Sequence, residues 1–190
     1  TEAAEQEPLR QRMAVYYVQI AESFQHHFGI GGNQVDSAAR LAAETDNLRA
    51  VLTWAVASGT EEVGFRLVGA LARFWFMRGQ VREGRDWMEA LLAASREGIA
   101  PEVLADAFNG AGLLAYRQSD HLQAEGWYRE ALTLYEQVHS QAGKADILRK
   151  LGLLEDARGN MQAATPYFEA SLGLYQQLGD EVGAAQMLHN

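Results

Sequence analysis

The chain repeats itself with a period of forty residues. A shift of forty aligns small residues with small ones, at Gly84, Ala124 and Ala164. It also aligns large residues with large ones: Trp87, Trp127 and Tyr167, then Met88, Tyr128 and Phe168, then Leu92, Leu132 and Leu172. Self-similarity at a fixed period in this range is typical of stacked-repeat proteins, in which each unit buries its apolar face against the next. The period therefore predicts a repeat scaffold, which binds ligands far more often than it catalyses reactions.

Charge and residue usage exclude several kinds of site. The net charge of −9 argues against direct contact with nucleic acid or with an anionic membrane, since both require a basic face. The absence of cysteine excludes disulfides, thiol nucleophiles and thiolate metal sites. No apolar run approaches the ~18 residues of a transmembrane helix, and the first residues lack the apolar stretch of a signal peptide. We therefore expect a cytoplasmic protein.

Both ends of the chain predict a fragment of a longer polypeptide. The sequence lacks an initiator Met and stops at Asn190, in the middle of a repeat. An activity could therefore belong to domains outside this sequence.

Apolar residues recur at steps of three and four, the period of an amphipathic helix. No window shows strand-type alternation flanked by hairpin turns. We predict an all-α chain of about nine helices packed as antiparallel pairs. Their expected ranges are 8–27, 35–57 with an interruption near Asp46, 61–78, 81–94, 101–118, 121–138, 141–158, 161–178 and a last helix from about 180.

The repeat columns predict how the helices approach one another. Small residues should face each other within a pair, as at Gly112 with Ala124, so that the two helices lie close together. Bulky residues such as Tyr128 and Phe168 should fill the layer between units. The predicted caps are Gly79, Gly159 and Gly179 at helix C-termini and Asp120, Asn160 and Asp180 at N-termini.

These columns resemble the tetratricopeptide repeat. One unit has Phe108, Ala111-Gly112, Ala124, Tyr128 and Ala131-Leu132, and the next has Leu148, Leu151-Gly152, Gly159, Ala164, Phe168 and Ser171-Leu172. The resemblance implies a right-handed superhelical solenoid of antiparallel helix pairs. It predicts repeats at about 65–104, 105–144 and 145–184 and a truncated fourth from 185, with residues 1–60 as connector helices that pack on the solenoid.

A second resemblance covers residues 10 to 95. Glu44 to Ala50, Trp54, Arg73-Phe74-Trp75, Glu83-Gly84-Arg85 and Trp87 resemble a segment of large bacterial ATPase-type (STAND/LuxR-like) transcriptional regulators. In those proteins a nucleotide-binding switch module precedes such helices, and a DNA-binding helix-turn-helix lies elsewhere in the chain. No switch or DNA-binding motif lies in the sequence itself.

The resemblance to tetratricopeptide solenoids also implies a binding groove, lined by the first helix of each pair. By the repeat columns this concave groove contains Arg66, Arg73, Phe76, Met77, Asp106, Asn109, Leu113, Tyr116, Arg117, Asp146, Arg149, Lys150, Leu153, Asp156, Gln186 and His189. Its basic and apolar side chains would suit an acidic or amphipathic peptide. Alternatively, the basic residues pair with Asp106, Asp146 and Asp156 across the groove. Leu113 and Leu153 replace the Asn of the family's carboxylate clamp, which argues against capture of a C-terminal carboxylate.

The sequence contains no pattern for catalysis, for a metal or for a cofactor. The GIGGN segment at 29–33 lacks the Lys-Ser/Thr of a P-loop and follows a helix, so a turn is the better interpretation. His26 and His27 are adjacent and point to different faces of a helix, which does not suit chelation. Adjacent acidic residues such as Glu61 and Glu62 also diverge, and they suit a first helical turn.

We therefore expect a non-catalytic interaction or sensor module of a bacterial regulator. It would bind a partner protein, a peptide or a small effector in the groove and relay this to adjoining domains of the same chain. One alternative is self-association as a homodimer through Met187 and Leu188, because a truncated repeat exposes an apolar face. Another is the regulatory part of an ATPase whose catalytic domain lies elsewhere.

Overall fold

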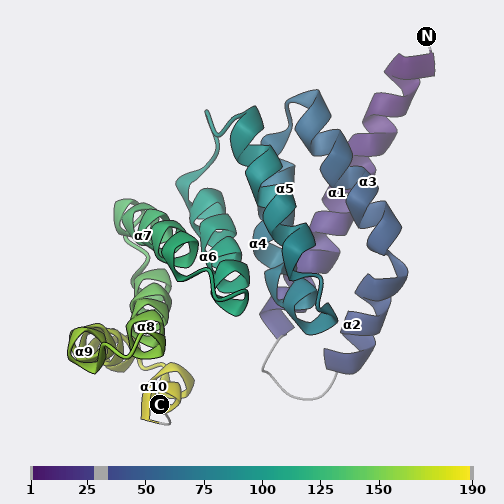
Figure 1. Ribbon diagram of the computed structural model, residues 1–190. Coiled ribbons are helices and arrows are strands. Elements are labelled where there is room, and N and C mark those ends of the chain that lie inside the picture. The colour runs from purple at the N-terminus through teal and green to yellow at the C-terminus, as the bar shows by residue number, and fades with distance from the viewer. Residues whose placement is uncertain (1, 28–33, 189–190) are drawn as a thin grey trace.

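The computed structural model describes residues 2–27 and 34–188, and it describes the side chains of residues 7–25 and 37–185. The described residues form helices joined by short turns, without a strand among them (Figure 1). The helices are α1 (Glu2–His27), α2 (Gln34–Ala43), α3 (Thr45–Ser58), α4 (Glu61–Arg78), α5 (Val81–Ala94), α6 (Pro101–Arg117), α7 (His121–Gln137), α8 (Gln141–Ala157), α9 (Met161–Leu178) and α10 (Glu181–Leu188).

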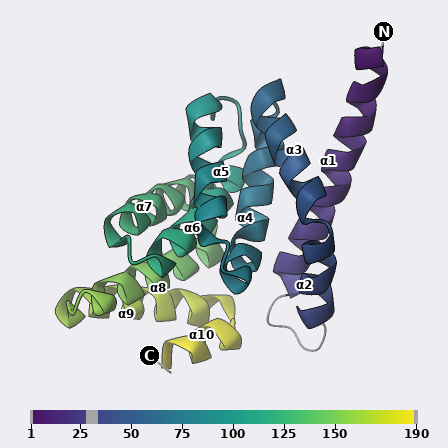
Figure 2. The ribbon, with the colours of Figure 1, turned by 45° about the vertical axis from the view of Figure 1, so that its right-hand side comes forward.

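The helices stack as a curved row of pairs, from α1 at one end to α10 at the other (Figures 1 and 2). Helix α6 packs against α7, its partner within the pair, and against α4, the first helix of the preceding pair. Helix α8 packs against its partner α9 and against α7, the second helix of the preceding pair, and α1 packs against α4. The predicted all-helical solenoid is confirmed.

The interruption predicted near Asp46 is present. It divides the 35–57 stretch into α2 and α3, so the described chain has ten helices rather than about nine. The break falls at Glu44, two residues before Asp46, and the Glu44 backbone has φ −99° and ψ 8°. The Glu44 carboxylate accepts hydrogen bonds from the Tyr17 hydroxyl at 2.8 Å and from Asn47 Nδ2 at 2.7 Å. The break is therefore held by contacts across the fold rather than by a side-chain cap.

Helix α1 also starts earlier than expected. It begins at Glu2, so Pro8 lies within the helix and not at its first turn. Ala, Glu and Gln are strong helix formers and fill residues 2–7, which favours helix on the N-terminal side of the proline.

The predicted caps have the expected places with one qualification. Gly79 and Gly179 adopt left-handed φ values of 70° and 67° at the ends of α4 and α9, and Gly159 has φ 80° just beyond α8. Asp120 and Asp180 each accept a backbone N–H from the first turn of the following helix. Asn160 occupies the N-cap position of α9 but makes no capping hydrogen bond, because its amide donates to Glu155 instead.

The large aromatic residues expected between units also pack within their own helix pairs. A Cβ atom added to Gly112 would come within 2.4 Å of the Tyr128 ring, and one added to Gly152 within 2.5 Å of the Phe168 ring. Each ring therefore lies against a glycine within its own helix pair. The small residue makes room for the ring and not only for close approach of the two helices.

The core is continuous from α1 to α8. Trp75 and Trp127 are buried in it, and Trp54 and Trp87 pack partly buried against it, as the helical spacing predicts. None of the described helices is long and apolar enough to cross a lipid bilayer.

Candidate functional site

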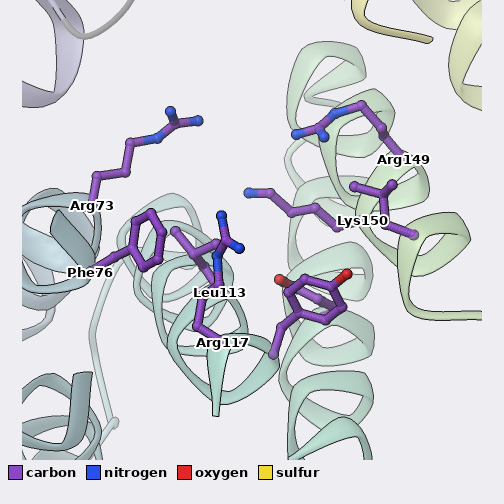
Figure 3. A pocket seen from close by; sticks show the side chains of 9 residues that line it. Arg73, Phe76, Leu113, Arg117, Arg149 and Lys150 are labelled. Atoms are coloured by element: carbon purple, nitrogen blue, oxygen red, sulfur yellow. The ribbon is translucent and has the colours of Figure 1, made fainter. Parts of the chain in front are cut away.

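A cavity of about 320 Å³ opens on the first helices of successive pairs. We call it the cationic pocket. It is lined by Arg73 and Phe76 of α4, Leu113, Tyr116 and Arg117 of α6, Tyr128 of α7, and Arg149, Lys150 and Leu153 of α8. Figure 3 shows the cationic groups of Arg73, Arg117, Arg149 and Lys150 arranged around a common space. The stacking of repeats thus brings together basic residues that lie up to seventy-seven positions apart in the sequence.

One side of the pocket is a cation–aromatic pair. The guanidinium carbon of Arg117 lies 4.1 Å from the centroid of the Phe76 ring, so Arg117 of α6 covers an aromatic residue of α4. An arginine stacked in this way keeps its N–H donors available at the edge of the guanidinium plane. Arg73 is exposed on the same side.

The opposite side is a charge network on α8. Asp146 accepts from Arg149 Nη2 and from Lys150 Nζ, each at 2.8 Å. Asn109 of α6 joins this network, because its oxygen accepts from Lys150 and its nitrogen donates to Asp146 at 3.1 Å. The Arg149 and Lys150 side chains are only 14% and 12% exposed. These two cations are therefore held in place by neighbours on two repeats.

The pKa values of this network show that cations dominate it. Burial alone would raise the pKa of Asp146, but the charges of Lys150 and Arg149 outweigh it and hold that pKa well below its ordinary value. Burial lowers the pKa of Lys150, and the neighbouring Arg149 and Arg73 lower it further. The Nε atom of Arg149 is buried without a hydrogen-bond partner among the described residues. The network can therefore accept additional negative charge.

The floor of the pocket includes a residue that the sequence did not indicate. Tyr128 is 1% exposed, and burial raises the pKa of its hydroxyl. The signal in the sequence was its alignment with Met88 and Phe168 in a column of large apolar residues, which is equally typical of core packing.

Eight of the predicted groove residues line the cationic pocket, and Asn109 and Asp146 hydrogen-bond to its lining residue Lys150. Arg66 pairs with Glu22 of α1, and Asp106 accepts the Tyr135 hydroxyl. Met77 is 45% exposed and lies outside the lining, as does the exposed Asp156. Gln186, by its side chain, and His189 lie outside the described residues, as do the side chains of Met187 and Leu188.

The alternative in which acidic residues neutralise the groove holds only in part. Asp146 pairs with Arg149 and Lys150, whereas Asp106 and Asp156 form no ion pair within the described part of the chain. Across residues 7–25 and 37–185, no three acidic or His side chains are grouped in a way that could hold a metal ion.

Comparison with known proteins supports a repeat domain. Residues 103–177 match the family model of the tetratricopeptide repeat, a scaffold that generally binds other proteins. The match covers α6 to α9, the helices that supply most of the pocket.

Curated relatives match only a short segment. A protein of Mycobacterium bovis and two of Mycobacterium tuberculosis, all named as HTH-type transcriptional regulators, are 36% identical to this chain over 58 residues. The segment is 30% of this chain and spans 7% of the length of each relative.

A solved structure shares the fold. The crystal structure of BtubC from P. vanneervenii aligns with a TM-score of 0.57 over 95% of this chain and 88% of that chain, at 16% identity. A crystal structure of MamA aligns less closely, with a TM-score of 0.45 over 90% of this chain and 96% of that one, also at 16% identity.

Proposed function

We propose that this chain is the interaction module of a bacterial signalling or transcriptional regulator, and that an acidic segment of a partner protein binds in its cationic pocket. One observation carries the proposal: cations from three successive repeats surround one cavity, and two of them, Arg149 and Lys150, share a single carboxylate, Asp146. An acidic segment would add negative charge beside Arg117, Arg149 and Lys150.

The lining suits a peptide better than a bare ion. Guanidinium groups donate forked hydrogen bonds to carboxylates. Leu113, Leu153 and Tyr116 are half-buried beside the cations and offer apolar surface for a neighbouring side chain. The acidic segment belongs either to another protein or to an adjoining domain of the same polypeptide, and both would present the same chemistry to the pocket.

The assignment to a regulator has two supports. One is the 36% identity to HTH-type transcriptional regulators over a short segment. The other is the resemblance of residues 10 to 95 to a segment of large bacterial ATPase-type regulators. In such a cytoplasmic regulator the module would not catalyse a reaction. ATP turnover by this chain alone would contradict that role.

The experiment is affinity capture from lysate of the source bacterium with the wild-type chain, Arg117→Glu and Arg82→Glu as baits. Arg117 lines the pocket, whereas Arg82 is 89% exposed and lies outside its lining. Arg149 is not chosen, since a glutamate there would face Asp146 and disturb the fold. Both variants make the same change of charge, and circular dichroism checks their helical content.

We expect a partner that the wild type and Arg82→Glu retain and that Arg117→Glu loses. The captured partner is then cut into overlapping peptides, and the binding peptide should be acidic. Equal capture by all three baits, or a binding peptide without acidic residues, would rule the proposal out.

A further inference from the structure

We infer that the bound segment carries a basic residue three to five positions from its acidic residue, because the face that holds the cationic pocket holds a second cavity of opposite charge. This inference rests on the proposed function. It specifies the charge pattern of the partner segment.

The second cavity measures about 540 Å³. We call it the acidic pocket. It is lined by Glu22 and Gln25 of α1, Arg66 and Ala70 of α4, and Val103 and Asp106 of α6. Two of its three helices, α4 and α6, also line the cationic pocket.

The two pockets lie on one face of these helices. Arg66, Ala70 and Arg73 follow one another at steps of four and three along α4, so they share a helix face. On α6, seven residues separate Asp106 from Leu113 and eleven separate it from Arg117. At 1.5 Å per residue, the pockets are about 10 to 16 Å apart along the helix axes.

The acidic pocket has an excess of negative charge. Arg66 donates to both carboxylate oxygens of Glu22, at 2.8 and 2.9 Å, which neutralises that pair. Asp106 remains, and the hydrogen bond that it accepts comes from the neutral Tyr135 hydroxyl. Burial raises the pKa of Asp106, the Tyr135 hydrogen bond and the charge of Lys150 oppose this, and the charges of Glu22 and Glu102 raise it further. A cationic side chain beside Asp106 would pair with its carboxylate.

The spacing of the pockets sets the spacing of the ligand charges. An extended peptide advances about 3.3 Å per residue, so 10 to 16 Å corresponds to three to five residues. A segment whose acidic residue lies in the cationic pocket would therefore place a basic residue beside Asp106 when its acidic and basic residues are three to five positions apart. A purely acidic segment would meet repulsion at Asp106.

The test is an array of octapeptides that are acetylated at the N-terminus and amidated at the C-terminus. Each peptide has one Glu and one Lys in a background of Ala and Leu, and the array covers every pair of positions for the two charges. A second copy of each peptide has Ala in place of the Lys. The array is probed with the wild type, Arg117→Glu, Asp106→Asn and Glu89→Gln, and affinities of the best peptides are measured by fluorescence polarisation. Asn can still accept the Tyr135 hydroxyl, so Asp106→Asn should fold. Glu89 is exposed on α5 and lies outside either lining, which makes its variant the matched control for the loss of one negative charge.

We expect the best peptides to have Lys three to five positions from Glu. Asp106→Asn should weaken them about fivefold, as the loss of one partly exposed ion pair would. It should leave the affinities of the Lys→Ala peptides unchanged, and Glu89→Gln should change the affinities of neither set.

Two outcomes separate this inference from the proposed function. If peptides bind through Arg117 but show no preference for Lys, the inference is wrong and the proposed function stands. The same holds if Asp106→Asn lowers thermal stability without changing peptide affinity, because a charge that only complements the helix dipole would behave in that way. If no peptide binds in a manner that depends on Arg117, both are wrong.

Discussion

At the scale of single residues, the turns repeat a left-handed backbone conformation. Gly79 and Gly159 have φ values of 70° and 80°. Ser119 and His139 adopt φ values of 59° and 56° at equivalent turns. Residues with a Cβ atom resist this region by roughly 1–2 kcal/mol, whereas glycine enters it readily. The repeat imposes the conformation even where the side chain opposes it.

Replacement of Ser119 or His139 by glycine should therefore stabilise the protein. We expect each change to raise the free energy of unfolding by about 0.5–1 kcal/mol, since relief of the strain exceeds the added entropy of the unfolded chain. Urea denaturation followed by circular dichroism measures this. Gln118→Gly is the control: its φ is −92°, so glycine there should destabilise. A loss of stability in Ser119→Gly and His139→Gly would show that their side chains make compensating contacts.

At the scale of helices, α8 joins α6 through one buried network. Asp146 links Arg149, Lys150 and Asn109, as described above. Removal of one partner from such a network leaves a buried charge without its counterion, which typically costs about 3 kcal/mol or more. The same carboxylate fixes the cations of the pocket, so its titration should affect stability and binding together.

Acidification should reveal this contribution. The folded-state pKa of Asp146 lies below its unfolded value near 3.8, so its stabilisation is complete above that pH and is lost as the pH falls through the folded-state pKa. Asp146→Asn should unfold about 3 kcal/mol more easily than the wild type at pH 7, and this difference should shrink below pH ~4. Urea titrations at pH 7, 5, 4 and 3 test this, with Asp156→Asn, an exposed residue of α8, as the control. A difference that stays constant over this range would contradict the prediction.

Helix boundaries were predictable where the turns carry a signal of their own. Gly79 and Asp120 mark turns by backbone freedom and by capping, and the helices around them begin and end close to the predicted residues. The interruption near Asp46 was also predicted, but the hydrogen bond from Tyr17 to Glu44 was not, because the two residues lie twenty-seven positions apart. The sequence therefore indicated the turns between helices but not the contacts between distant helices.

The site was predictable to the same extent. The repeat columns identify which face of α4, α6 and α8 is shared, but they do not show where along that face a cavity opens. Arg66 and Arg73 lie on the same face of α4, yet they line different pockets. Whether Arg149 and Lys150 pair with Asp146 depends on side-chain rotamers, which the spacing alone does not determine.

At the scale of the whole molecule, each pair depends on its neighbours. Helix α4 contacts α1, α3, α5 and α6, whereas α8 contacts α7 and α9. In a solenoid the stability is roughly a sum of unit terms and nearest-neighbour interfaces. A destabilising substitution near one end of the row should therefore unfold only the neighbouring helices, whereas one in α4 should destabilise several helices at once.

Two core truncations test this difference. Leu151 of α8 is 3% exposed and Leu71 of α4 is 1% exposed, so either Leu→Ala change should cost about 2–5 kcal/mol at its own site. We expect Leu151→Ala to lose amide hydrogen-exchange protection mainly in α8 and α9 while α3 to α5 remain protected. Leu71→Ala should lose protection from α1 through α6, because four helices pack on α4. Uniform loss in Leu151→Ala would instead mean that the row unfolds as one cooperative unit. The pocket would then be disrupted as a whole rather than from its α8 side.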